Sequence, residues 1–101
     1  MILLPKPLLF EWDNGNKDKN FIKHNVTMQE AEEVFSNEPF LVSNDTKHSQ
    51  YEIRYQALGK TKKKRKLFLS FMIRDTKVRL ISIRDMNKKE EVVYEKFEAN
   101  S

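Results

Sequence analysis

Four arginines stand in segments whose residue pattern predicts β-strands, and they are the residues best suited to chemistry on an anion. A guanidinium group keeps its positive charge at physiological pH and presents its N–H donors in a fixed plane. Placing it in a sheet is costly unless it is paired or faces something anionic. The candidate ligands of an anion are therefore Arg54, Arg74, Arg79 and Arg84.

The positions of the first two arginines suggest a role and an alternative for each. Residues two apart on a strand point the same way, so Arg54 shares the polar face of its strand with Glu52. The two side chains either act together on a substrate or form a cross-strand ion pair, which is common and weak on a surface. Arg74 ends the next strand on the face of Ser70 and Phe68, where it either meets an anion or extends into solvent at a hairpin turn.

The other two arginines are five residues apart, which on a regular strand puts them on opposite faces. Only one of them could then serve a single site. We favour Arg84, which shares a face with Ser82. A β-bulge between Arg79 and Arg84 would bring both to the same face.

The charge of the chain is concentrated in one segment. Residues 1–58 hold 6 Lys and Arg against 9 Asp and Glu, residues 60–84 hold 10 against 1, and residues 85–101 hold 3 against 5. Such a basic segment is typical of a protein with a polyanionic partner, most often a nucleic acid. The alternative is a solvated loop that keeps a sheet edge from pairing with a neighbour. The run at its centre is Lys62, Lys63, Lys64, Arg65 and Lys66.

Composition excludes several classes of protein. The chain has no cysteine and only 2 histidines, so a disulfide framework, an iron–sulfur cluster and a cysteine-rich zinc site are impossible. Gly-rich phosphate loops, the G-x-S-x-G elbow and the H-E-x-x-H zinc helix are all missing from the sequence. We expect no cofactor and no metal. No apolar run approaches the length that spans a bilayer, and residues 1–10 lack a basic leader, so we expect a cytoplasmic protein.

The elements that must position these residues form an α+β pattern within a single domain, residues 1–101, and we expect an antiparallel sheet with two N-terminal helices and one C-terminal helix. Thr27 with Glu30 makes a capping box at the start of a helix, and Asn87 with Glu90 makes a second. The last helix spaces Val93 and Phe97 four residues apart, as an apolar face requires. Alternation and turn residues predict strands at 8–12, 40–43, 51–58, 67–74 and 78–84, and helices at 17–24, from 28 to about 36, and 87–98.

An ordered set of motifs between residues 10 and 94 resembles the BrnT family, the toxin halves of bacterial type II toxin–antitoxin pairs. Three positions depart from the family pattern: Asn16 followed by Lys17 stands where a Lys is usual, Asn25 replaces a Gly, and Ile83 replaces a small residue. None of these removes a charged motif residue. The motifs are Phe10-Glu11-Trp12-Asp13, Asn20, Lys23-His24, Glu30-Ala31, Val34-Phe35, Glu52, Arg54-Tyr55, Gly59, Arg74, Arg79 to Arg84, Glu91 and Tyr94.

The resemblance implies a RelE-like fold, ribonuclease activity that arrests growth, and neutralisation by a BrnA-type antitoxin that carries a ribbon-helix-helix DNA-binding domain. Operator DNA would then be bound only through the antitoxin. Cleavage of RNA without a metal needs a base for the ribose 2′-hydroxyl, an acid for the leaving oxygen and cations near the transition state. The alternative is a module that binds RNA or an acidic protein through the basic hairpin and breaks no bond.

The motif match adds His24 and Lys23 to the candidate residues, the first as catalytic and the second as RNA-binding. A histidine that closes a helix also satisfies terminal carbonyls, so a structural role for His24 competes with a catalytic one. Trp12 and Phe35 are expected in the core, with stacking on a nucleobase as the alternative.

Overall fold

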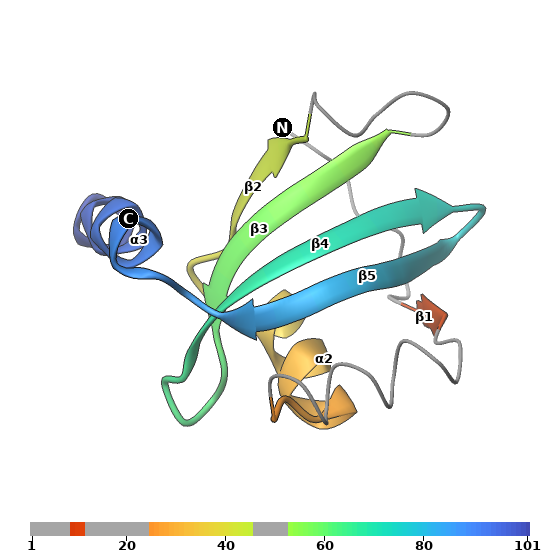
Figure 1. Ribbon diagram of the computed structural model, residues 1–101, viewed down its shortest axis with the longest axis horizontal. Helices are drawn as coiled ribbons and strands as arrows, with labels where there is room; N and C mark the ends of the chain where they lie inside the picture. Colours follow the sequence, from red (N-terminus) through yellow and green to blue (C-terminus); the bar gives the residue numbers. More distant parts are fainter. Residues whose placement is uncertain (1–8, 12–24, 46–52) are drawn as a thin grey trace.

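The structure is a computed structural model, and it describes residues 9–11, 25–45 and 53–101. These residues form a five-stranded sheet and two helices, which confirms the α+β class (Figure 1). The elements are β1 (Leu9–Glu11), α2 (Met28–Ser36), β2 (Leu41–Asn44), β3 (Arg54–Lys60), β4 (Lys66–Arg74), β5 (Lys77–Asp85) and α3 (Lys88–Ala99).

The sheet has the strand order β1-β5-β4-β3-β2. Strands β2 to β5 pair antiparallel, each with the next strand along the chain, as expected for strands joined by short connections. Strand β1 instead pairs parallel with β5, so the prediction of an antiparallel sheet is wrong at this edge. The predicted strands are otherwise confirmed within two or three residues of their observed ends.

One face of the sheet carries the hydrophobic core, and α2 covers it. The capping box of Thr27 and Glu30 is present, and the helix buries Ala31, Val34 and Phe35 against the sheet. The ring of Phe35 lies 5.1 Å from that of Phe71 in an edge-to-face arrangement, so Phe35 is a core residue as expected. Apolar residues of β4 and β5 complete this core: Leu67, Leu69, Val78, Leu80 and Ile83.

Helix α2 approaches the sheet closely at one residue of β3. A Cβ atom added to Gly59 would lie 2.5 Å from Cγ1 of Val34 and 3.3 Å from Cδ1 of Phe40. Only glycine leaves room for α2 at this distance.

Helix α3 lies beside the end of the sheet where β3 ends and β4 begins (Figure 1). The predicted capping box of Asn87 and Glu90 begins it. Its buried residue is Tyr94, whose hydroxyl donates a 2.6 Å hydrogen bond to the carbonyl oxygen of Pro39. Val93, predicted to face the core, is instead 52% exposed. Ion pairs from Lys60 to Glu98 and from Lys66 to Glu95 also join α3 to the sheet, which explains how a helix with little apolar surface is held.

The helix predicted at 17–24 lies outside the described residues. Neither α2 nor α3 is long and apolar enough to cross a membrane.

Candidate active site

A β-bulge in β5 brings the two arginines of that strand to one face. Phe71 of β4 pairs with Leu80, but its neighbour Ser70 pairs with Ser82, so Ile81 is an extra residue on β5. Arg79 and Arg84 therefore both project from the face opposite the core. The expectation for a regular strand is wrong here, and the bulge alternative is confirmed.

The register of the strands puts all four arginines on this face, which we call the arginine face. Arg54 pairs with Met72, which pairs in turn with Arg79, so these three residues form a row across β3, β4 and β5. Neighbouring strands are about 4.8 Å apart, so the two arginines of the row start about 10 Å apart on either side of Met72. Both side chains are long enough to converge on one anion above Met72. Arg74, the last residue of β4, and Arg84 lie on either side of this row.

An acidic residue is the neighbour of each arginine of the row on the next segment of the sheet. Glu11 of β1 pairs with Arg79, and the Oε1 atom of Glu11 lies 3.9 Å from Nη1 of Arg79. Asp45 follows β2, and its backbone N–H donates a 2.7 Å hydrogen bond to the carbonyl of Arg54. Asp45 is 8% exposed, whereas the Glu11 side chain is 40% exposed and accessible from solvent. Across the sheet, the residues of this row therefore follow in the order Glu11, Arg79, Met72, Arg54 and Asp45.

Sequence reasoning did not place Glu11 or Asp45 in the site. Glu11 reaches it only because β1 joins the far side of β5, a pairing that no local pattern predicts. Asp45 continues the antiparallel register of β2 with β3, so a correct pairing of these two strands would have found it.

The Arg84 side chain is fixed in position by several contacts within the protein. Its Nη1 and Nη2 atoms donate hydrogen bonds of 2.8 and 3.0 Å to the two carboxylate oxygens of Glu90. Its guanidinium carbon lies 4.2 Å from the centre of the Phe68 ring. Burial opposes ionisation of Glu90, but the hydrogen bonds from Arg84 and from the Asn87 backbone outweigh it and lower the pKa of Glu90 below its usual value. Arg84 therefore links β5 to the start of α3.

The structure divides the basic run into two groups. Lys62, Lys63 and Lys64 are exposed at the tip of the loop between β3 and β4. The loop is ordered by backbone hydrogen bonds from Thr61 to the Arg65 carbonyl and from Lys64 to the Thr61 carbonyl, both 2.9 Å long. These three side chains are open to a polyanion.

Arg65 and Lys66, in contrast, have acidic partners within the protein. Arg65 donates hydrogen bonds of 2.7 and 3.0 Å to Asp85, and its Nη1 atom lies 3.1 Å from Oε2 of Glu30. Hydrogen bonds to Asp85 raise the pKa of Arg65 above its usual value. Lys66 binds Glu95 at 2.9 Å. The RNA-binding role of both residues stays a prediction, and RNA would have to compete with these ion pairs for the two side chains.

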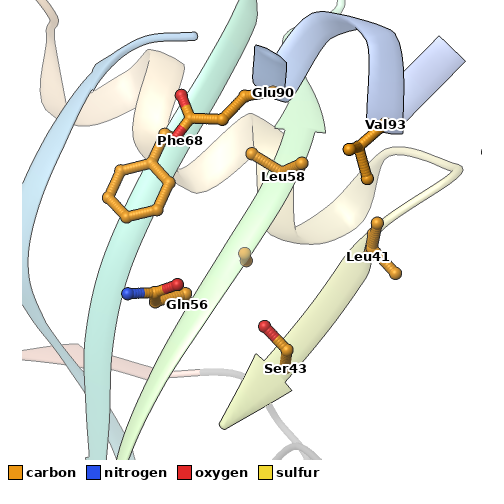
Figure 2. A pocket seen from close by; sticks show the side chains of 8 residues that line it. Leu41, Ser43, Gln56, Leu58, Phe68, Glu90 and Val93 are labelled. Atoms are coloured by element: carbon orange, nitrogen blue, oxygen red, sulfur yellow. The ribbon is translucent and has the colours of Figure 1, made fainter. Parts of the chain in front are cut away.

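A pocket of about 300 Å³ opens at the end of the arginine face nearest α3. Figure 2 shows its side chains on the near surface of the sheet, with α3 above them. The lining residues are Leu41, Ser43, Gln56, Ala57, Leu58, Phe68, Glu90 and Val93.

Several predicted site residues lie outside the described part of the chain: Glu52, His24, Lys23 and Trp12. Their catalytic, RNA-binding or core roles stay predictions. Within residues 9–11, 25–45 and 53–101, no three histidine, aspartate or glutamate side chains gather as they would around a metal ion.

Comparison with known proteins agrees with these observations. A search of curated proteins gave no match. A family model described as the ribonuclease toxin BrnT of type II toxin–antitoxin systems matches residues 12–90. The match includes β2 to β5, α2 and the arginines at positions 54, 74, 79 and 84. Because it covers well over half of the sequence, the chain belongs to the BrnT family of ribonuclease toxins of type II toxin–antitoxin systems.

Proposed function

We propose that this ribonuclease cleaves RNA at the arginine face without a metal ion. As a member of a ribonuclease toxin family it is an RNA-cleaving enzyme with a cognate antitoxin. The observation that carries the proposal is the row of Arg54, Met72 and Arg79, in which two arginines flank one apolar residue and each has an acidic residue as its neighbour on the next segment of the sheet. A phosphodiester above Met72 lies between two guanidinium groups.

The chemistry requires one proton to leave and another to arrive. A base takes the proton of the ribose 2′-hydroxyl, and the oxygen attacks the adjacent phosphorus. The bond from phosphorus to the 5′-oxygen of the next nucleotide breaks, that oxygen takes up a proton, and a 2′,3′-cyclic phosphate remains. Extra negative charge develops on the phosphate oxygens in the transition state, where Arg54 and Arg79 stabilise it.

Glu11 is our proposed base, because its carboxylate is accessible and lies next to Arg79. Asp45 is mostly buried beside Arg54 and serves as a positioning residue for that guanidinium. Arg74 and Arg84 extend the positive surface along the RNA on either side of the row, and Lys62, Lys63 and Lys64 attract more distant phosphates. Glu52 and His24 are kept as further proposed participants from the sequence pattern.

The test is cleavage of a labelled single-stranded RNA by the purified protein, with excess EDTA or with Mg²⁺. We expect the same rate under both conditions and a product that ends in a 2′,3′-cyclic phosphate. Arg79→Ala and Glu11→Gln should lower the rate about a hundredfold or more, while Lys89→Ala, an exposed cation at the start of α3, should leave it unchanged. Loss of activity in EDTA contradicts metal independence. Full activity of both site variants would show that cleavage does not take place at the row of Arg54, Met72 and Arg79.

We also propose that the antitoxin is of the BrnA type, with a ribbon-helix-helix domain through which the complex binds operator DNA in the cytoplasm. The resemblance to the BrnT family supports this partner. It also supports our proposal that the sheet and helices have a RelE-like arrangement. A short downstream reading frame encoding such a protein is the expected genetic context. Co-expression should restore growth and yield a stable complex. An operator fragment that shifts with the toxin alone would contradict the division of roles.

A further inference from the structure

The pocket between α3 and the sheet is part of the same surface as the arginine face. Leu58 and Phe68 form the next row of side chains after Gln56 and Ser70, and Phe68 pairs with Arg84. Gln56 lies two residues from Arg54 on the same face, or about 7 Å along the strand. A ligand in the pocket is therefore within one nucleotide of the proposed cleavage site.

The lining of the pocket combines apolar walls with a few polar groups. Leu41, Leu58 and Phe68 provide the walls, and the exposed Val93 of α3 provides its rim (Figure 2). The Gln56 amide and the Ser43 hydroxyl lie among them, and within the described ranges neither makes a hydrogen bond to another residue. A flat heteroaromatic ring with donors and acceptors on its edge matches this combination.

Charge near the pocket favours a ligand that carries a phosphate. Arg84 covers one side of Phe68 at 4.2 Å, and Arg54 lies beyond Gln56. Glu90 is turned toward Arg84 and is neutralised by it, so the pocket keeps a polar acceptor without a strong repulsion of phosphate. A volume of about 300 Å³ is at the lower end of small-ligand sites, enough for a single base and too small for a folded element of a protein.

From these observations we infer that the pocket binds one unpaired nucleobase of the RNA and so determines which nucleotide adjoins the cleaved bond. The base inserts between Leu58, Phe68 and Val93, and the Gln56 amide pairs with its edge. Since an amide presents a donor and an acceptor side by side, it discriminates between bases whose edges differ. This inference rests on the proposed function of the arginine face.

Nucleotide binding can be measured without cleavage. The probes are the four 5′-mononucleotides, titrated into the protein with methyl signals of Leu41 and Leu58 followed by NMR, and ribose 5-phosphate as the probe that lacks a base. We expect one or two of the nucleotides to shift these signals and ribose 5-phosphate to shift none. Gln56→Leu should weaken the binding of the preferred nucleotide about tenfold. Equal binding of the four nucleotides by the wild type and by Gln56→Leu would overturn the inference.

The second measurement is cleavage of oligonucleotides that differ in one base next to the cleaved bond. The wild type should prefer one base, and Gln56→Leu should reduce that preference about tenfold, mainly by slowing cleavage of the preferred substrate. Arg54→Ala should slow all substrates equally, and Val92→Ala, an exposed neighbour outside the pocket, should change nothing. An unchanged preference in Gln56→Leu contradicts the base pocket alone. Weaker antitoxin binding with an unchanged preference assigns the pocket to the antitoxin and also overturns the inference.

Discussion

Arg79 and Arg84 project from the same face of β5 although five positions separate them, because Ile81 is accommodated as an extra residue in the β4–β5 ladder. The bulge gives the two arginines different neighbours. Arg79 lies in the row with Met72 and Arg54, whereas Arg84 lies over Phe68 and binds Glu90. The two residues should therefore respond differently to substitution.

Replacing Arg54 or Arg79 by alanine should abolish most of the ribonuclease activity, and Arg79→Ala should do so with little effect on folding. Neither side chain belongs to the core, and each faces the proposed phosphate position. Loss of a bidentate contact to the charged transition state corresponds to about 3 kcal/mol, or a rate lower by a hundredfold or more. Growth arrest on expression and the thermal midpoint of the purified variant measure the two quantities. A variant that loses toxicity only because its midpoint falls is not part of the site.

Arg84→Ala should instead lower stability. It removes both hydrogen bonds to Glu90 and the contact with Phe68, and it leaves the Glu90 carboxylate without its guanidinium partner. Because Arg84 is about one third exposed, we expect a loss of about 1 kcal/mol, or roughly 4–8 °C in Tm. The double variant Arg84→Ala with Glu90→Ala should be more stable than the sum of the single effects predicts. Additive effects would show that the ion pair contributes nothing.

Replacing Lys62, Lys63 and Lys64 together by glutamine should weaken RNA binding without slowing cleavage at saturating RNA. On single-stranded RNA each phosphate contact contributes about 0.7 to the slope of log K against log salt, so the slope should fall by up to about 2. The Tm should not change, since these side chains are exposed. Arg65→Gln is the matched variant, and because it breaks contacts to Asp85 and Glu30 it should lower Tm. An unchanged salt slope in the triple variant would indicate a loop that only protects the sheet edge.

Stability should fall in acid partly through Glu30. Burial opposes its ionisation, but hydrogen bonds from the Thr27 backbone and from Arg65 outweigh it and lower its pKa below the ordinary value of 4.5. A lowered pKa in the folded state gives stability that is present above 4.5 and is lost as the pH falls through the folded value. Glu30→Gln should therefore be less stable than the wild type at pH 7, and the difference should narrow below pH 4.5.

Urea midpoints between pH 7 and pH 3 measure this narrowing. Glu38→Gln is the control, because Glu38 is an exposed carboxylate outside these hydrogen-bond networks. A difference between the wild type and Glu30→Gln that stays constant with pH would show that the interaction does not depend on the charge of Glu30.

Gly59→Ala should destabilise the protein by about 1–3 kcal/mol, since the added methyl group would lie 2.5 Å from Cγ1 of Val34. Val34→Ala removes that atom at the expense of a cavity. The double variant should then be more stable than additivity predicts, which denaturant unfolding of all four proteins will show. Simple additivity would mean that the helix moves away from the sheet without strain.

Local chemistry was the predictable part of this fold. Both capping boxes, at Thr27 and Asn87, depend on residues three apart, and the turn at Asp75 joins two strands that are neighbours in the chain. The parallel pairing of β1 with β5 was not predictable, because it joins segments more than sixty residues apart. The residues of helix α3 were predicted correctly, but its buried residue is Tyr94 and not Val93. The Tyr94 hydroxyl donates a hydrogen bond to the carbonyl of Pro39, and the helix sequence alone does not reveal this distant partner.

The same distinction applies to the candidate site. The arginines could be chosen from their strand positions, but the acids beside them could not, since Glu11 and Asp45 arrive from separate strands. Arg65 was grouped with its lysine neighbours because the sequence does not distinguish the members of a run of basic residues. Its acidic partners, Glu30 and Asp85, are 35 and 20 residues away, and only the folded chain brings them together.

The parallel pairing of β1 with β5 also means that the proposed site joins the first and the last strand of the chain to be synthesised. At the edge of the sheet, β1 has β5 as its neighbour, so Glu11 has to wait for Arg79 to leave the ribosome. Arg84 in turn acquires its partner only when Glu90 emerges. A growing chain interrupted before residue 79 holds one arginine of the row and no completed edge. On the proposed mechanism, prematurely terminated products should therefore lack ribonuclease activity.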